Sequence, residues 1–193
     1  MTLLITGLVV FLGVHSVRIF GDGFRSAQIA RLGPNPWKGL YSLVSLAGFA
    51  LIVWGFAQAR QHPVFLWTPP FWMHYATTVF ALLAFILIAA AYVPGNRIKP
   101  AIGHPMVAGV KSWAFGHLLS AFSLAGFVLF GAFFVWAILD YAASRRRDSA
   151  AGVVYPAGTA SRDALTCAVG AAAWFVFAFW LHGPLIGIAP FGS

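Results

Sequence analysis

The side chains that could carry chemistry in this sequence are histidines placed among long apolar runs. The chain has six histidines, and two of them, His15 and His117, fall inside apolar segments rather than at their rims. A polar side chain within a bilayer is costly, so such a residue is a functional candidate. A structural role stays open for each ring, because a buried histidine can also hydrogen-bond a carbonyl group on a neighbouring helix.

His15 and His117 belong to different predicted helices, so their rings could face one another. The sequence has no glutamate, and its four aspartates lie in loops or at the ends of apolar runs. Magnesium and calcium need several oxygen ligands, and zinc held by two histidines alone would lack ligands. Neutral imidazole is a usual axial ligand of haem iron, and a helical bundle is a usual cradle. Haem is therefore the cofactor that best matches the pair.

A third histidine, His104, precedes Pro105 at the predicted start of the helix that carries His117. The two histidines are 13 residues apart, about 20 Å along a helix and on different faces, so they cannot share one iron. Basic residues at the same rim could bind the acidic groups of a haem through charge-assisted hydrogen bonds. These candidates are Arg18, Arg97, Lys99 and Lys111. Their presence does little to distinguish a cofactor site from ordinary membrane topology, which also requires basic residues at that rim.

The composition is that of an integral membrane protein. Hydrophobic residues make up 61% of the chain and charged residues 8%, whereas soluble domains carry about a quarter charged residues. The net charge of +8 comes from basic residues between apolar runs, a pattern of membrane topology rather than of nucleic-acid binding. The single cysteine, Cys167, excludes an intrachain disulfide. The first apolar run has no basic residue before it, so we expect a retained span rather than a cleaved signal.

The apolar runs predict an all-α bundle of six transmembrane helices, with five as the alternative. The clear spans are roughly 2–20, 39–59, 72–93 and 164–187. The run 105–141 is too long for one helix, and a break near Ser120–Ser123 would divide it into two short ones. Glycines interrupt the first and fourth spans, where small residues allow close approach of helices or of a flat cofactor: Gly7, Gly13, Gly109 and Gly116.

The basic residues favour six spans over five. With six, eleven of the twelve Lys and Arg residues fall on one side of the membrane and only Arg60 falls on the other. The positive-inside rule then predicts that both termini lie on the non-cytoplasmic side. Residues 143–163 are small, polar and basic, and we expect them to form a mobile cytoplasmic loop.

Five separated segments resemble the NnrU family of bacterial membrane proteins. In chain order they are FLGVHSVRIF (11–20), RLGPNPWKGLYSLVSLAGFALIVWGF (31–56), PGNRIKPAIGHP (94–105), KSWAFGHLL (111–119) and LHGPLIGIAP (181–190). The resemblance covers essentially the whole chain, which implies a single NnrU-like transmembrane domain over residues 1–193 and a multi-pass protein of the bacterial inner membrane. The family is associated with denitrification and nitric oxide metabolism, and it is related to 15-cis-zeta-carotene isomerase, a membrane enzyme containing haem b.

By this resemblance, His15 and His117 match the axial ligands of a haem b iron, and His104 matches a further histidine of the site. Arg18 and Lys111 are then expected to bind the cofactor's acidic groups. The resemblance implies a haem b protein of nitric oxide or denitrification physiology, acting as a sensor, a redox partner or an accessory factor. A haem-dependent cis–trans isomerase of a carotenoid-like polyene is the alternative.

A small-solute transporter built on the Gly-interrupted helices is a further alternative, although the chain lacks internal repeats and intramembrane carboxylates. The expected partners are the lipid bilayer and either nitric oxide or an apolar polyene, with no nucleic acid. The sequence does not indicate the oligomeric state. It also assigns no chemical role to His62, His74, His182 and Cys167.

Overall fold

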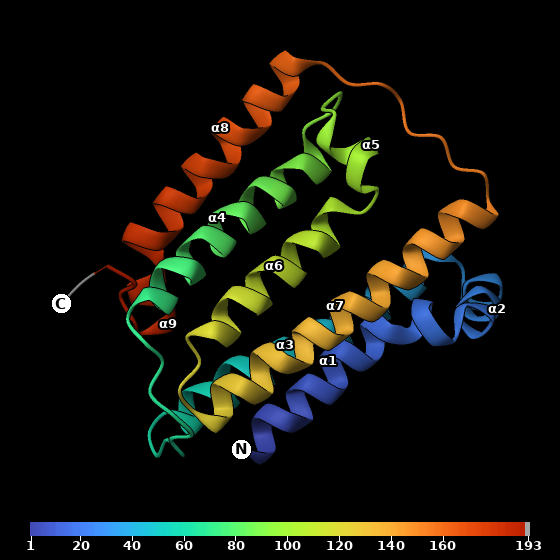
Figure 1. Ribbon diagram of the computed structural model, residues 1–193. Helices are drawn as coiled ribbons and strands as arrows, with labels where there is room; N and C mark the ends of the chain where they lie inside the picture. The colour runs from blue at the N-terminus through green and yellow to red at the C-terminus, as the bar shows by residue number, and fades with distance from the viewer. Residues whose placement is uncertain (192–193) are drawn as a thin grey trace.

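The computed structural model describes residues 1–191, and over this range the chain is all-α, as the sequence predicts. The helices are drawn in Figure 1. They are α1 (Thr2–Phe20), α2 (Asp22–Leu32), α3 (Pro34–Ala59), α4 (Trp72–Tyr92), α5 (Ile98–Ile102), α6 (Pro105–Leu119), α7 (Leu124–Ala150), α8 (Ala160–Val176), a π-helical turn (Phe177–Leu181) and α9 (His182–Ile186).

Five of these segments are long and apolar enough to cross a membrane: α1, α3, α4, α7 and the continuous run Ala160–Ile186. Large apolar side chains on them face outward, including Val9, Leu43 and Val79, which are 67%, 69% and 63% exposed. An aqueous surface would disfavour so much exposed apolar area, whereas lipid accommodates it. The structure thus supports a membrane protein with several apolar helices.

The run 105–141 is divided as predicted, because α6 ends at Leu119 and α7 begins at Leu124. With 15 residues, however, α6 is about 22 Å long, less than the roughly 30 Å of a hydrocarbon core. Within residues 1–191, five helices rather than six are therefore long enough to span. The sixth crossing and the orientation of the termini stay predictions.

The connection between α7 and α8 is shorter than the expected loop 143–163. Residues 143–150 extend α7, and the non-helical part is 151–159. Alanine and arginine dominate residues 142–147, and both favour helix even where the sequence is polar.

Glycines let the helices approach closely. A Cβ atom added to Gly7 of α1 would lie 2.6 Å from the backbone nitrogen of Ile52 in α3, and one added to Gly116 of α6 would lie 2.6 Å from Cβ of Phe80 in α4. Gly13, by contrast, has nothing within 4 Å of its added Cβ. A Cβ atom on Gly109 of α6 would lie 2.9 Å from the carbonyl oxygen of Ala84 in α4, so three of the four glycines that the sequence singles out in the first and fourth spans lie at helix contacts.

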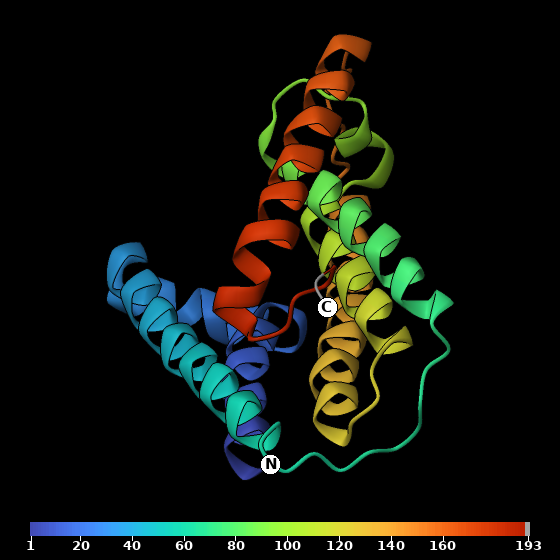
Figure 2. The ribbon, with the colours of Figure 1, turned by 90° about the vertical axis from the view of Figure 1, so that its left-hand side faces the viewer.

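Helix α7 connects two groups of helices. It packs on α1, which lies along α3, and it packs on α6, which lies along α4 with α8 on the far side of α4. Figure 2 shows the α1–α3 pair diverging from the other group. A buried cluster fills the contact of α1, α3 and α7: Leu4, Leu8, Ile52, Ala125 and Leu129. In both views the N-terminus and the connection 60–71 lie at the end of the bundle opposite to α5 and the start of α8.

Candidate functional site

A groove of about 1090 Å³ lies at the end of the bundle where α1 and α7 finish and where α3 and α6 begin. His15 and His104 both line it, so the structure brings these two histidines to one cavity. The groove is rich in positive charge, with five basic residues against two aspartates. The basic residues are Arg18, Arg25, Lys38, Lys99 and Arg147, and the acidic ones are Asp140 and Asp148.

The His15 ring is held in one orientation by its own helix and by aromatic neighbours. Its Nδ1 lies 2.6 Å from the carbonyl oxygen of Phe11, one turn earlier in α1. The ring stacks on Phe11 at 4.2 Å between centroids, with Tyr41 at 5.2 Å and Trp136 at 6.0 Å. An Nδ1–H that donates to a carbonyl leaves the lone pair on Nε2, which is the arrangement usual in metal-binding histidines.

His117 has the same local arrangement on α6. Its Nδ1 lies 2.8 Å from the carbonyl oxygen of Trp113, and its ring lies 5.3 Å from Trp113 and 4.8 Å from Phe130. Unlike His15, it does not line the groove. The Nε2 atoms of His15 and His117 have no hydrogen-bond partner within residues 1–191.

A row of aromatic rings connects the two histidines. His15 stacks on Phe11, Phe11 lies 5.8 Å from Phe133, Phe133 lies 5.5 Å from Trp113, and Trp113 contacts His117. The rings come from α1, α7 and α6 in turn, because α7 packs against both of the other helices. The two imidazoles therefore border one aromatic surface without contacting each other.

His104 is engaged differently from the other two. Its Nε2 lies 2.8 Å from Oδ2 of Asp148 near the end of α7, and the hydroxyl of Tyr155 donates to the same oxygen. Burial and this hydrogen bond raise the pKa of Tyr155 above its ordinary value, so the hydroxyl stays a donor. With Nε2 already bonded to a carboxylate, His104 is a weaker candidate for binding iron than His15 or His117.

Of the four basic residues predicted to bind the acidic groups of a cofactor, two line the groove and two do not. Arg18 and Lys99 line the groove. Arg97 instead forms an ion pair with Asp163 at 2.6 Å, and the Nζ atom of Lys111 lies 4.9 Å from the centre of the Tyr141 ring. Arg97 and Lys111 do not line the groove, so neither is placed beside His15.

Sequence reasoning did not single out Trp136. Its indole Nε1 is buried and has no hydrogen-bond partner within the described residues, and its ring lies at the groove wall beside His15. Trp136, Asp140 and Ser144 line the groove at intervals of one helical turn along α7. That spacing of polar residues in an apolar helix was the available signal.

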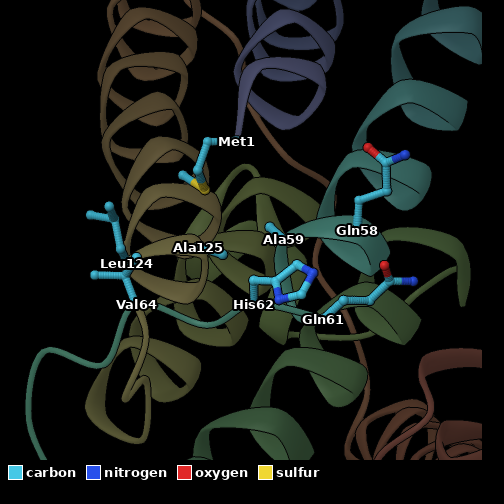
Figure 3. Close-up of a pocket in the computed structure, with 8 residues that line it drawn as sticks. All are labelled: Met1, Gln58, Ala59, Gln61, His62, Val64, Leu124 and Ala125. Atoms are coloured by element: carbon cyan, nitrogen blue, oxygen red, sulfur yellow. The ribbon is translucent and has the colours of Figure 1, made fainter.

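The remaining histidines lie elsewhere. A smaller cavity of about 340 Å³ lies at the opposite end of α1, α3 and α7, where an exposed His62 lines it together with Gln58 and Gln61 (Figure 3). His74 lies in the first turn of α4, and His182 begins α9, where its Nδ1 is 2.6 Å from the carbonyl oxygen of Ile188. Over residues 1–191 no three or more His, Cys, Asp or Glu side chains cluster as a metal site.

Comparison with known proteins assigns the family. The model of the NnrU family, described as NnrU protein, matches residues 3–190, which is nearly the whole chain. No curated protein and no solved structure matches the chain. The match runs through α1, α6 and the groove between them, so it includes all three of the histidines considered above. The chain therefore belongs to the NnrU family.

Proposed function

We propose that this protein is a haem b-binding protein of the bacterial inner membrane that serves nitric oxide or denitrification physiology. One observation carries the proposal: His15 and His117 have the same anchored arrangement at two ends of one aromatic row. In each, a carbonyl oxygen one turn earlier holds Nδ1 and leaves Nε2 free for iron.

The donor set fits a haem better than a bare metal ion. The described residues hold no cluster of three or more metal-binding side chains. A porphyrin brings four nitrogen donors of its own, so the imidazoles of His15 and His117 would hold its iron without a carboxylate. Phe11, Phe133 and Trp113 offer aromatic faces on which a flat macrocycle can pack. When bound, haem iron supplies gas binding and electron transfer.

His104 has a supporting role in this proposal. Its Nε2 is bonded to Asp148, so it orients the start of α6 against the end of α7 rather than binding iron. Arg18 and Lys99, which line the groove beside His15 and His104, are positioned to bind acidic groups of the cofactor. Lys111 has a different role, because its Nζ atom lies over the Tyr141 ring and the residue does not line the groove.

The proposed topology has six crossings, with α6 as a short one, and both termini on the non-cytoplasmic side. The charge distribution supports it. Arg97 precedes α5, Arg162 lies in the first turn of α8, and Arg145, Arg146 and Arg147 lie near the end of α7. Arg60 instead follows α3, and Figure 1 shows the end of α3 at the end of the bundle opposite to α5 and the start of α8. Single cysteines introduced at His62 and at Ser149, in a Cys167→Ser background, test it with a membrane-impermeant thiol reagent on intact cells. We expect labelling at position 62 only; labelling at 149 would contradict the orientation.

The test of haem binding is the absorption spectrum of the purified chain in detergent, oxidised and reduced, with a pyridine haemochrome assay. We expect a Soret band, and we expect His15→Ala and His117→Ala each to abolish or shift it. His62→Ala is the matched control, because His62 lies at the other end of the bundle. If both substitutions leave the wild-type spectrum, the ligand assignment is wrong.

The gas-linked role has a separate test. Nitric oxide added to the reduced protein should shift the Soret band, and a deletion strain should show altered nitric oxide or nitrite consumption. If the strain is normal in both and the protein instead converts a cis polyene to the trans form in a polyene-accumulating host, the isomerase alternative holds.

A further inference from the structure

We infer that Trp136 is a binding residue of the groove: its indole N–H donates a hydrogen bond to a carboxylate of the haem, with Arg18 and Lys38 supplying positive charge. This assignment rests on the haem proposal above. It adds a residue that neither the histidine pattern nor the family match indicates.

The indole N–H of Trp136 has no partner of its own within the described residues. Nε1 of Trp136 is buried, yet no acceptor lies within hydrogen-bond distance among residues 1–191. An unsatisfied buried donor destabilises a fold, and native proteins contain few of them. Because the residue also lines the groove, a ligand bound there can supply the missing acceptor.

Trp136 lies beside His15, the proposed iron ligand. Its ring lies 6.0 Å from the His15 ring at an interplanar angle of 90°. The carboxylate nearest in sequence, Asp140, lies one turn further along α7 and is within 4.0 Å of Arg147. A ligand bound by His15 would therefore lie beside the indole of Trp136. Asp140 is not the missing acceptor, because it is paired with Arg147.

Positive charge surrounds the groove on the α1–α3 side. Arg18 follows His15 by three residues and Lys38 precedes Tyr41 by three, so each lies about one helical turn from the His15–Tyr41 contact. Both side chains line the groove, and neither forms an ion pair with a carboxylate in the described part of the chain. The groove thus has the His15 imidazole at one place and the cations Arg18 and Lys38 nearby, which suits a ligand that carries both a metal and acidic groups.

The experiment compares haem b with its dimethyl ester, in which both carboxylates are blocked. The full-length chain is purified from haem-limited cells, and each iron porphyrin is titrated while the Soret absorbance is followed. We expect Trp136→Phe to weaken haem b binding about tenfold, as for a lost hydrogen bond to a charged group, and to leave binding of the ester nearly unchanged. Arg18→Gln should show the same selectivity.

The matched control is Trp113→Phe. Trp113 belongs to the same aromatic row, but it does not line the groove and its indole nitrogen is not a buried unpartnered donor. It should affect both porphyrins equally. Gel filtration of each variant confirms that it is folded. If Trp136→Phe is not folded, Arg18→Gln tests the carboxylate site independently.

Several outcomes overturn the assignment. An equal loss of affinity for haem b and for the ester in Trp136→Phe would show that the indole is only an apolar wall. Unchanged affinity for both would show that its N–H bonds nothing on the cofactor. Both results leave haem binding intact, whereas failure of the wild-type chain to bind haem b at all refutes the proposed function itself.

Discussion

Gly7→Ala, compared with Gly13→Ala in the same helix, measures how tightly α1 is packed against α3. A methyl group at Gly7 would lie 2.6 Å from the nitrogen of Ile52 and 2.8 Å and 2.9 Å from atoms of Leu51. Ordinary contacts of a Cβ begin near 3.4 Å, so the two helices must separate by about 0.8 Å or distort. Overpacking of this kind costs about 1–3 kcal/mol.

Gly13→Ala removes the same helix-weakening glycine but meets no atom within 4 Å. It should stabilise α1 by up to about 1 kcal/mol, because alanine favours helix over glycine. Both variants gain the helix propensity of alanine, so the difference between their free energies of unfolding isolates the cost of the contact at Gly7. About 2 kcal/mol corresponds to roughly 4–8 °C for a chain of this size.

Thermal unfolding in detergent, followed by tryptophan fluorescence and by size-exclusion recovery after heating, gives the two Tm values. We expect Gly7→Ala to unfold several degrees below Gly13→Ala. A Tm of Gly7→Ala at or above that of Gly13→Ala would refute the close α1–α3 contact. The placement of His15 against Tyr41, which depends on that contact, would then be wrong as well.

Three further predictions concern the groove end of the bundle. Tyr155→Phe should lower the Tm at pH 8 because it removes the hydrogen bond to Asp148. Since folding raises the pKa of Tyr155, the difference in Tm from wild type should shrink as the pH rises above about 10. A series of Tm measurements from pH 8 to 11 checks this. His104→Ala should lower the Tm but leave the Soret position of the haem-loaded protein unchanged; a shifted Soret band would make His104 an iron ligand. Thr159→Ala, which removes the side-chain cap of α8, should destabilise the chain by about 1 kcal/mol in the same unfolding assay, and an unchanged Tm would contradict the cap.

The division of the run 105–141 could be predicted because its signals are local. Pro105 is well suited to the first turn of α6, and Ser123 accepts a hydrogen bond from the backbone nitrogen of Gly126 to cap α7. The length of the apolar run, which is too great for one helix, is also read from the sequence without any knowledge of the tertiary structure. The end of α7 was missed because polar residues suggested a loop, whereas the helix propensity of alanine and arginine continues the helix to Ala150.

The partners of the candidate residues could not be predicted from the sequence. His104 and Asp148 are 44 residues apart, and only the packing of α6 on α7 brings them together. Helices that face lipid are apolar all round, so their sequence does not fix which side turns toward a neighbour. For the same reason, the sequence did not indicate that Trp136 lines the groove, or that His117 lies outside the cavity that His15 lines.

The position of α7 between two groups of helices has a mechanical consequence. His15 belongs to the pair that α7 holds on one flank, and His117 to the group that it holds on the other. If one group rotated about α7, the distance between these imidazoles would change, whereas the glycine contacts within each group would be kept. A ligand bound by both imidazoles would therefore hold the two groups of helices together, and its release would leave them able to move apart.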